Sequence, residues 1–306
     1  MSTLFSHFFQ KINNIPPLEH NFTEVLASIA VMPKTLYFYG KMPENMVKNG
    51  QKMRPKCVAI VGSRHNTKYG EEVAYKLGYE LAKHGVIVIS GLAFGIDSIG
   101  HRAAIDAGGK TVAVLGTPID EIYPRCHRPL AEEIVRTGGA IISEYAPGEK
   151  VYPKTSFLER NRLISGLSDI VVVVEAAEQS GSLNTATHAL EQGKEVFAVP
   201  GNITSPYSQG CNKLIRQGAF PYTEPDDILR ELFPEEYSAR KKRKKHLKGD
   251  TDVETLILTA IARGLRSGEE IMKETKLPPE VFNQNVTLLE IKGRVKALGA
   301  NNWSLN

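Results

Sequence analysis

Two short clusters in this sequence combine the residue types that bind phosphate, and each lies beside a glycine turn. Their members are Gly62, Ser63 and Arg64 in the first cluster, and Ser180, Gly181 and Ser182 in the second. Glycine lets the backbone approach a ligand, serine and the first amides of a helix donate to phosphate oxygens, and arginine supplies a forked charge. The clusters therefore predict an anion site, although Arg64 alone could equally form a surface ion pair.

A third cluster places four donor-rich side chains within nine residues, next to Tyr152 and Phe157. These side chains are Lys154, Arg160, Asn161 and Arg162. Such a set suits a nucleic-acid strand, because cations hold phosphates and an aromatic ring stacks on a base. Arg160 and Arg162 lie about 200° apart on a helix, so we expect one of them to be structural. The alternative is an exposed helix face that pairs with acids such as Glu159.

A longer glycine loop spans residues 90–97 and leads into a helical pattern. We expect four of its residues to shape a pocket: Gly91, Gly95, Asp97 and His101. Asp97 is placed to cap the helix, and His101 lies one turn later on the same face. The favoured alternative is that Asp97 only caps and His101 only packs. No serine or cysteine nucleophile accompanies them, and the eight histidines lack metal-ligand spacing, so we expect neither an acyl-transfer triad, a metal nor a cofactor.

The segments that carry these clusters have the pattern of a parallel sheet with helices. Val/Ile-rich runs end in Gly, Ser or an acid, and helical patterns follow at residues 69–84, 98–107, 128–137, 157–166 and 183–192. Continuous apolar strands are typical of a sheet covered on both faces, whose ligands bind at the carboxyl ends of its strands. The sequence therefore predicts an α/β fold with an extended Rossmann-like, doubly wound and mostly parallel sheet.

Four regions follow from the composition. We expect an N-terminal extension with a lead-in strand (1–55), the Rossmann-like domain (56–233), a basic linker (234–250) and a small C-terminal winged-helix domain (251–306). From Asp250 onward there are seven basic and eight acidic residues, and the third helix of this domain carries only Lys292. A helix that reads DNA is normally basic, so protein interaction is favoured for this domain. The linker is either a solvated hinge or an auxiliary nucleic-acid contact.

The overall charge of +4 depends on one segment. Residues 240–248 hold seven of the 38 Lys and Arg residues, which leaves 31 against 34 Asp and Glu elsewhere. Any nucleic-acid binding by the folded part must then come from a local groove. No apolar run approaches the length of a membrane span, no signal peptide is evident, and the three cysteines lie far apart. We expect a cytoplasmic protein with reduced thiols and no membrane partner.

The motifs, taken in order, resemble the DNA-processing protein A family (DprA, also called Smf). The matching pieces are VGSR, SGLAFGID with His101, GTPIDEIYP, SEYAPG, RNRLISGLSD, EAAEQSGSLNTA, VFAVPG and GCNKLIRQGA. The resemblance covers residues 33–230 approximately. It implies a Rossmann-like domain that is not an enzyme, binds single-stranded DNA, usually forms a dimer, and hands the strand to a RecA-type recombinase in natural transformation.

The resemblance also implies roles for particular residues. Arg64 and Lys154 match the family's DNA-contacting cations. Gly62 and Ser63 are implied as site residues because they belong to the GSR motif, and residues 160–162 because they form the RNR motif. Three positions depart from the family pattern. Leu158 stands where the family usually has proline, His127 stands where it has asparagine, and Asn184 stands where it has an apolar residue. These departures concern local loop shape more than the fold.

Two other functions are alternatives to the single-stranded DNA binding that the resemblance implies. A nucleotide phosphoribohydrolase-like enzyme could use Glu144 or Glu175 as the carboxylate that acts on a ribose. Against it, the chain has PGNIT at 200–204 in place of the PGGxGT run of those enzymes. A regulator that reads double-stranded DNA with the winged helix is the second competitor.

Overall fold

The computed structural model of the protein describes residues 11–48, 51–235 and 247–306. The chain separates into two compact units, one ending at Leu232 and the other beginning at Phe233. Each unit is described by itself. Within the described ranges, no helix has both the length and the apolar character needed to cross a bilayer.

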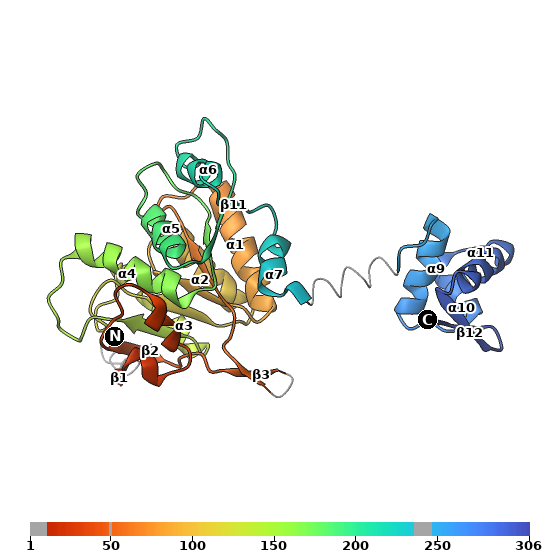
Figure 1. Ribbon diagram of the computed structural model, residues 1–306, viewed down its shortest axis with the longest axis horizontal. Helices are drawn as coiled ribbons and strands as arrows, with labels where there is room; N and C mark the ends of the chain where they lie inside the picture. Colours follow the sequence, from red (N-terminus) through yellow and green to blue (C-terminus); the bar gives the residue numbers. More distant parts are fainter. Residues whose placement is uncertain (1–10, 49–50, 236–246) are drawn as a thin grey trace. The chain divides into compact units, whose positions relative to one another are not determined.

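The first unit is built on a nine-stranded sheet in the order β1-β2-β8-β7-β6-β5-β9-β10-β11. Figure 1 shows the ribbon of this unit. Its strands are β1 (Asn13–Ile15), β2 (Leu36–Gly40), β5 (Cys57–Val61), β6 (Ile87–Ser90), β7 (Thr111–Val114), β8 (Ala140–Ser143), β9 (Ile170–Val173), β10 (Glu195–Ala198) and β11 (Phe220–Pro221). The pairs from β8 through β11 are parallel, whereas β1 and β2 are added antiparallel.

The order of the strands reverses at β5. The chain runs outward from β5 through β6, β7 and β8, and then returns to the other side of β5 with β9, β10 and β11. The strands β5 and β9 are neighbours, and their register pairs Val61 with Val173. The two strands therefore end side by side. Such a reversal leaves a crevice at the carboxyl ends of the strands, because the following helices lie on opposite faces.

Helices cover both faces of the sheet, as the near-continuous apolar strands require. They are α1 (Lys68–Lys83), α2 (Ile96–Asp106), α3 (Arg128–Arg136), α4 (Pro153–Leu167), α5 (Gly181–Glu191), α6 (Gln209–Arg216) and α7 (Pro225–Leu232), with short 3-10 turns η1 (Pro17–Glu19), η2 (Glu24–Ser28) and η3 (Arg125–His127). The alternating side chains of β5 explain the two layers. Ile60 packs toward Gly100 of α2, whereas Ala59 and Val61 join the core that contains Leu163 of α4. The prediction of a doubly wound, mostly parallel fold is confirmed.

The segment before β5, within the extension expected at 1–55, contains more than a lead-in strand. It contains a separate antiparallel hairpin of β3 (Met46–Lys48) and β4 (Gln51–Met53). The hairpin is not part of the main sheet. Each of its strands has only three residues, too few to show an alternating pattern in the sequence.

The second unit has three helices followed by an antiparallel hairpin. These are α9 (Asp252–Ala262), α10 (Gly268–Thr275), α11 (Pro279–Ile291), β12 (Val295–Gly299) and β13 (Asn302–Leu305). A compact apolar core that includes Phe282, Ile257 and Leu289 holds them together. The winged-helix assignment stays a prediction, although this order of elements is the one it requires. Most of the basic run at 240–248 lies outside the described residues.

Candidate functional site

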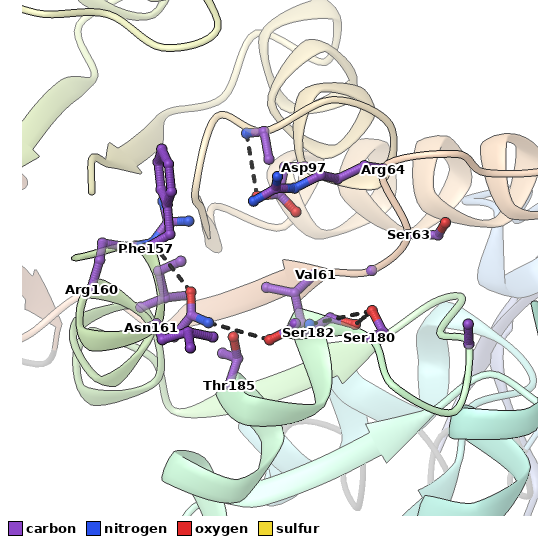
Figure 2. Close-up of a pocket in the computed structure, with 16 residues that line it drawn as sticks. Val61, Ser63, Arg64, Asp97, Phe157, Arg160, Asn161, Ser180, Ser182 and Thr185 are labelled. Atoms are coloured by element: carbon purple, nitrogen blue, oxygen red, sulfur yellow. Dashed lines mark hydrogen bonds between the residues drawn. The ribbon is translucent and has the colours of Figure 1, made fainter. Parts of the chain in front are cut away.

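A cavity of about 410 Å³ opens where the sheet reverses its strand order, at the carboxyl ends of β5 and β9. We call it the switch cavity. Its lining is Val61, Gly62, Ser63, Arg64, Ala93, Asp97, Phe157, Leu158, Arg160, Asn161, Ile164, Ala177, Ser180, Gly181, Ser182 and Thr185. Figure 2 shows these side chains arriving from the end of β5, from α4 and from the start of α5. All three sequence clusters therefore contribute to one hollow.

The loop after β5 forms one side of the switch cavity and touches the loop before α2. A Cβ atom at Gly62 would lie 2.7 Å from Ile96 Cγ1 and 2.9 Å from the Glu175 carbonyl oxygen, so only glycine fits there. Gly95 has φ of 73°, where side chains are disfavoured, and it also abuts Ser63. The Ile96 amide donates to the Ser63 carbonyl oxygen at 3.2 Å. These contacts fix the position of the Gly62–Arg64 backbone.

The start of α5 forms the opposite side. Ser180 is the N-cap residue, and its Oγ lies 2.8 Å from Ser182 Oγ while accepting a long 3.4 Å bond from the Ser182 amide. A Cβ atom at Gly181 would meet no atom within 4 Å, so the backbone is open to the cavity at this point. The amides at a helix start point outward with a partial positive charge. This side can receive a phosphate oxygen.

Arg64 supplies a positive charge at the rim of the cavity. Its guanidinium lies 5.7 Å from the centre of the Phe157 ring, and its side chain is exposed. Within the described ranges, no carboxylate forms an ion pair with it. A cation stacked on a ring but left without a counterion is free to bind an anion. The surface ion pair that was the alternative for Arg64 is absent from the described part of the chain.

Lys154 does not line the cavity. It is the second residue of α4 and is exposed. Phe157 follows it by three residues, which places both on neighbouring positions of one helix face. Because Arg64 stacks on Phe157, the two cations are on the same side of the molecule.

Arg160 lies in the floor of the cavity and is only 4% exposed. It donates to the carbonyl oxygens of Gly91, at 2.8 Å, and Val114. Burial lowers its pKa to about 10, which still leaves it charged at neutral pH. A Cβ atom at Gly91 would overlap the guanidinium, so this glycine makes room for it. Arg160 thus organises the cavity from beneath, because its Nε and Nη1 donors are bound within the protein.

Arg162 points away from the cavity. It forms an ion pair of 2.6 Å with Glu144, and both side chains are largely buried. This ion pair agrees with the expectation that one of the two arginines is structural, whereas Arg160 lines the cavity. Their opposite directions follow from the 200° between positions i and i+2 of a helix.

Asn161 connects the floor to the start of α5. Its Oδ1 accepts from Arg160 Nε at 3.2 Å, and its Nδ2 donates to the Gly181 carbonyl oxygen at 3.3 Å and to Asn184 Oδ1 at 3.1 Å. Asn184 is one of the departures from the family pattern. Its amide gives Asn161 a polar partner, so the departure adds a hydrogen bond at this place.

Asp97 does not cap α2 as predicted, and Gly95 is the N-cap residue instead. The Asp97 carboxylate turns back and accepts from the amides of Gly91, at 3.0 Å, and Ala93, at 3.4 Å. Burial raises the pKa of Asp97, and the nearby charge of Arg160 opposes that rise. The carboxylate therefore holds the glycine loop in shape, because the loop supplies donors closer than the helix start does.

His101 is fully buried and does not line the cavity. Its Nδ1 lies 2.6 Å from Thr111 Oγ1, whose hydroxyl donates to the Val88 carbonyl oxygen at 2.6 Å. The hydroxyl has one proton, so His101 Nδ1 must donate to Thr111. Burial lowers the pKa of His101 to about 3, which keeps the ring neutral. It packs between α2 and β7, in agreement with the favoured alternative.

Two aromatic residues beside the cavity were missed by the sequence analysis. Tyr123 lies 5.4 Å from the Phe157 ring, and Phe94 lies 5.1 Å from the His127 ring. Tyr123 is 48% exposed and Phe94 is 46% exposed. They border a small hollow that also contains Arg64. An aromatic residue inside a glycine loop was the available signal for Phe94.

His127, the second departure, contacts the same glycine loop. Its Nδ1 lies 2.9 Å from the Leu92 carbonyl oxygen, so the ring donates to the loop. Leu92 has φ of 58°, an uncommon conformation for a residue with a side chain. The bond helps to hold that conformation, and with it the position of Phe94.

The carboxylates needed by the enzyme alternative are engaged elsewhere. Glu175 accepts from the Thr67 amide at 2.8 Å and from the Thr67 hydroxyl at 2.6 Å, and Glu144 is paired with Arg162. Neither lines the switch cavity. Across the described ranges there is also no group of His, Cys, Asp and Glu side chains suited to a metal ion. Both carboxylates that the enzyme alternative needs are therefore bound within the protein and lie outside the lining of the cavity.

The single basic residue expected on the third helix of the second unit is engaged in ion pairs. Lys292, its basic end, lies 2.6 Å from Asp250 Oδ2 and 2.7 Å from Glu254 Oε1. Glu254 is only 2% exposed, so this ion pair is part of the packing of the unit. The charge that a double-stranded DNA reader would need on α11 is therefore neutralised internally.

Comparison with known proteins finds relatives whose names agree with one another. The sequence model of the family described as DNA recombination-mediator protein A matches residues 13–233. The DNA processing protein DprA of Bacillus subtilis is 42% identical over 73% of this chain and 72% of its own length. The Protein Smf of Escherichia coli is 49% identical over 57% of this chain but only 46% of its own length.

Solved structures agree with these relatives. The DNA processing protein A of Streptococcus pneumoniae has a TM-score of 0.62 at 36% identity, covering 74% of this chain and 76% of that one. DNA processing protein A of Helicobacter pylori has a TM-score of 0.63 at 29% identity, covering 74% of this chain and 98% of that one. The latter structure is described as giving insight into a single-stranded DNA binding mode.

Proposed function

Because the chain belongs to the DNA recombination-mediator protein A family, we propose that it binds single-stranded DNA in the switch cavity. In this proposal it protects the incoming strand in the cytoplasm and loads a RecA-type recombinase on it. It acts as a homodimer in natural transformation or recombination. The related protein of Helicobacter pylori, whose structure concerns single-stranded DNA binding, supports the choice of ligand.

One observation carries the proposal: an unpaired cation stands between an open helix start and a group of exposed aromatic rings. Arg64 faces the cavity that the Gly181 backbone also borders, and Phe157 lies directly beneath the guanidinium. The cation and the helix amides suit phosphate, whereas the rings suit the faces of bases. A nucleic-acid strand carries both phosphates and base faces, so it matches both features of the cavity.

The aromatic rings favour an unpaired strand over a duplex. Tyr123 and Phe94 are each about half exposed next to Arg64. A base can stack on such a ring only when it has left its duplex, and stacking contributes about 1–3 kcal/mol per base. The described part of the first unit offers a local cationic rim and no broad basic face, which also suits a short bound segment.

Binding without bond cleavage fits the lining of the cavity. Its polar side chains are Ser63, Asp97, Asn161, Ser180 and Ser182, together with Thr185 and the two arginines. Asp97 is bound to the amides of the glycine loop, so it is not free to act as a base. We therefore propose that the protein holds the strand and performs no chemistry on it.

The test is the double variant Arg64→Ala with Lys154→Ala, measured with fluorescent oligothymidylate in solution. Removing two phosphate contacts should weaken binding at least tenfold and reduce the salt dependence of the affinity by about 1.4 units of the log–log slope. Both residues are exposed, so the free energy of unfolding should not change.

Two outcomes would overturn the proposal. The first is a double variant that binds the oligothymidylate as tightly as the parent protein. The second is release of free base from nucleoside monophosphates by the parent protein, which would show a phosphoribohydrolase activity. Matched removal of Lys83 and Arg136, in the last turns of α1 and α3, serves as the control, because these turns lie at the amino ends of the strands.

A further inference from the structure

The first unit has a second hollow, beside α6. It is separate from the switch cavity. We call it the α6 groove. It encloses about 340 Å³ and is lined by Glu178, Ile203, Gln209, Asn212, Lys213 and Arg216. We propose that the α6 groove is a second phosphate-binding subsite, into which a DNA strand continues after leaving the switch cavity. This inference rests on the proposed function.

The α6 groove carries two exposed cations on one helix face. Lys213 and Arg216 are three residues apart in α6, so they lie on the same side of the helix. Arg216 forms no ion pair with any residue that the structure describes. Lys213 has a single long contact of 3.9 Å with Glu178, and both side chains are well exposed. An exposed pair of that length is weak, so both cations can bind an anion.

The two hollows share one turn of the chain. Ala177 and Ser180 line the switch cavity, whereas Glu178, between them, lines the α6 groove. The Ser180 amide donates to the Ala177 carbonyl oxygen at 3.1 Å, which closes this turn. Two residues of backbone span at most about 7 Å, so the two hollows border the same turn and are within reach of one continuous strand.

The turn and α6 are held together, so their geometry is fixed. The Gly210 amide donates to the Ala176 carbonyl oxygen at 2.8 Å, and the Ala176 amide donates to the Tyr207 carbonyl oxygen at 2.9 Å. Both α5 and α6 pack against β10, so they lie on neighbouring parts of the sheet (Figure 1). The two cation sites therefore keep one spacing, as a continuous path for a strand requires.

The walls of the α6 groove also suit an unpaired strand. Asn212 is bound to Gly201 through both polar atoms of its side chain, at 3.3 Å and 3.0 Å, which anchors the loop that carries Ile203. Ile203 is 85% exposed at the groove. An exposed apolar side chain opposite two cations can contact a base while the cations hold the phosphates.

The experiment compares two lengths of labelled oligothymidylate on the full-length protein. An oligonucleotide of about 2 nucleotides fills the switch cavity alone, whereas one of about 20 nucleotides reaches both hollows. The variant Lys213→Ala with Arg216→Ala should bind the long strand about tenfold more weakly, with a salt slope lower by about 1.4, and should bind the short strand like the parent. Glu178→Gln should bind the long strand about twofold more tightly, because it removes an acid from the path.

The control is Lys83→Ala with Arg136→Ala, which removes the same charge from exposed positions at the opposite edge of the sheet. It should bind both lengths like the parent. An α6 variant that binds the long strand like the parent overturns the inference, and so does an equal loss for both lengths.

Failure of the inference can be told apart from failure of the proposed function. Arg64→Ala should weaken binding of both lengths. If it does so while the α6 variant matches the parent, only the α6 groove is excluded. If Arg64→Ala binds the short strand like the parent, the switch cavity itself is the wrong site, and the inference falls with it.

Discussion

Arg64 at the rim and Arg160 in the floor line the same cavity, but they meet different surroundings. Arg64 is exposed, stacks on Phe157 and has no carboxylate partner among the residues described. Arg160 is 4% exposed and donates to two carbonyl oxygens. In the proposed function, the exposed Arg64 at the rim binds either water or the ligand. The buried Arg160 in the floor keeps its contacts, and so the shape of the cavity, with and without the ligand.

Arg64 and Arg160 are two kinds of cation that the sequence alone does not distinguish. A buried charged group that donates to the backbone of the protein contributes to stability and to the shape of the site. A charged group left exposed contributes to affinity and to its dependence on salt. Changes in the floor should therefore alter unfolding, and changes in the rim should alter binding alone.

The largest effect is expected for Arg160→Ala. The variant leaves the Gly91 and Val114 carbonyl oxygens without a donor and leaves Asp97 buried without its nearby positive charge. The free energy of unfolding should fall by about 3–5 kcal/mol, as for other broken buried charge networks. Urea denaturation measures it, with Arg64→Ala as the control. A loss below about 1 kcal/mol would remove Arg160 from the structural role assigned to it.

The next effect concerns the dependence of stability on pH at His101. Its pKa is about 3 in the folded protein, against an ordinary value of 6.5, so the unfolded chain takes up a proton that the folded protein refuses. The stability from the neutral ring is complete above pH 6.5 and is lost as pH falls toward 3. Between pH 7 and pH 5 the parent should lose about 2 kcal/mol more than His101→Gln. Equal losses in the two proteins would contradict the buried neutral ring.

A smaller effect should appear at the aromatic part of the rim. Tyr123→Ala removes an exposed ring next to Phe157 and should weaken binding of single-stranded DNA about tenfold. Tyr123→Phe keeps the ring and should bind like the parent. Fluorescence anisotropy with oligothymidylate tests both variants. A phenylalanine variant as weak as the alanine variant would mean that the hydroxyl, and not the ring, contacts the strand.

The smallest effect is expected for Lys154→Ala alone. Lys154 is exposed and outside the switch cavity, so it should contribute one exposed phosphate contact. We expect a loss of about threefold in affinity and a salt slope lower by about 0.7. Lys83→Ala should show neither change. An unchanged salt slope for Lys154→Ala would place the strand away from the start of α4.

The sequence by itself determined the fold and the edge of the sheet where the site lies. The helix predicted at 69–84 is α1 at Lys68–Lys83, and the helix predicted at 128–137 is α3 at Arg128–Arg136. Apolar runs and glycine ends are local signals, so they needed no knowledge of distant contacts. The first turn of α4 was missed because its apolar pattern starts only at Phe157, although Pro153 is a suitable first residue.

Only the tertiary structure decided what each polar residue of the site does. Arg160 is buried because Gly91 and Val114, distant in the sequence, bring carbonyl oxygens to it, and Arg162 is paired because Glu144 lies beside it. Asp97 serves the glycine loop because the amides of that loop fold back over it. Residue type fixes the charge of a group, but its partners are set by which strands are neighbours in the sheet. For this reason the sequence located the site, and the fold separated the groups that hold it together from those left free for a ligand.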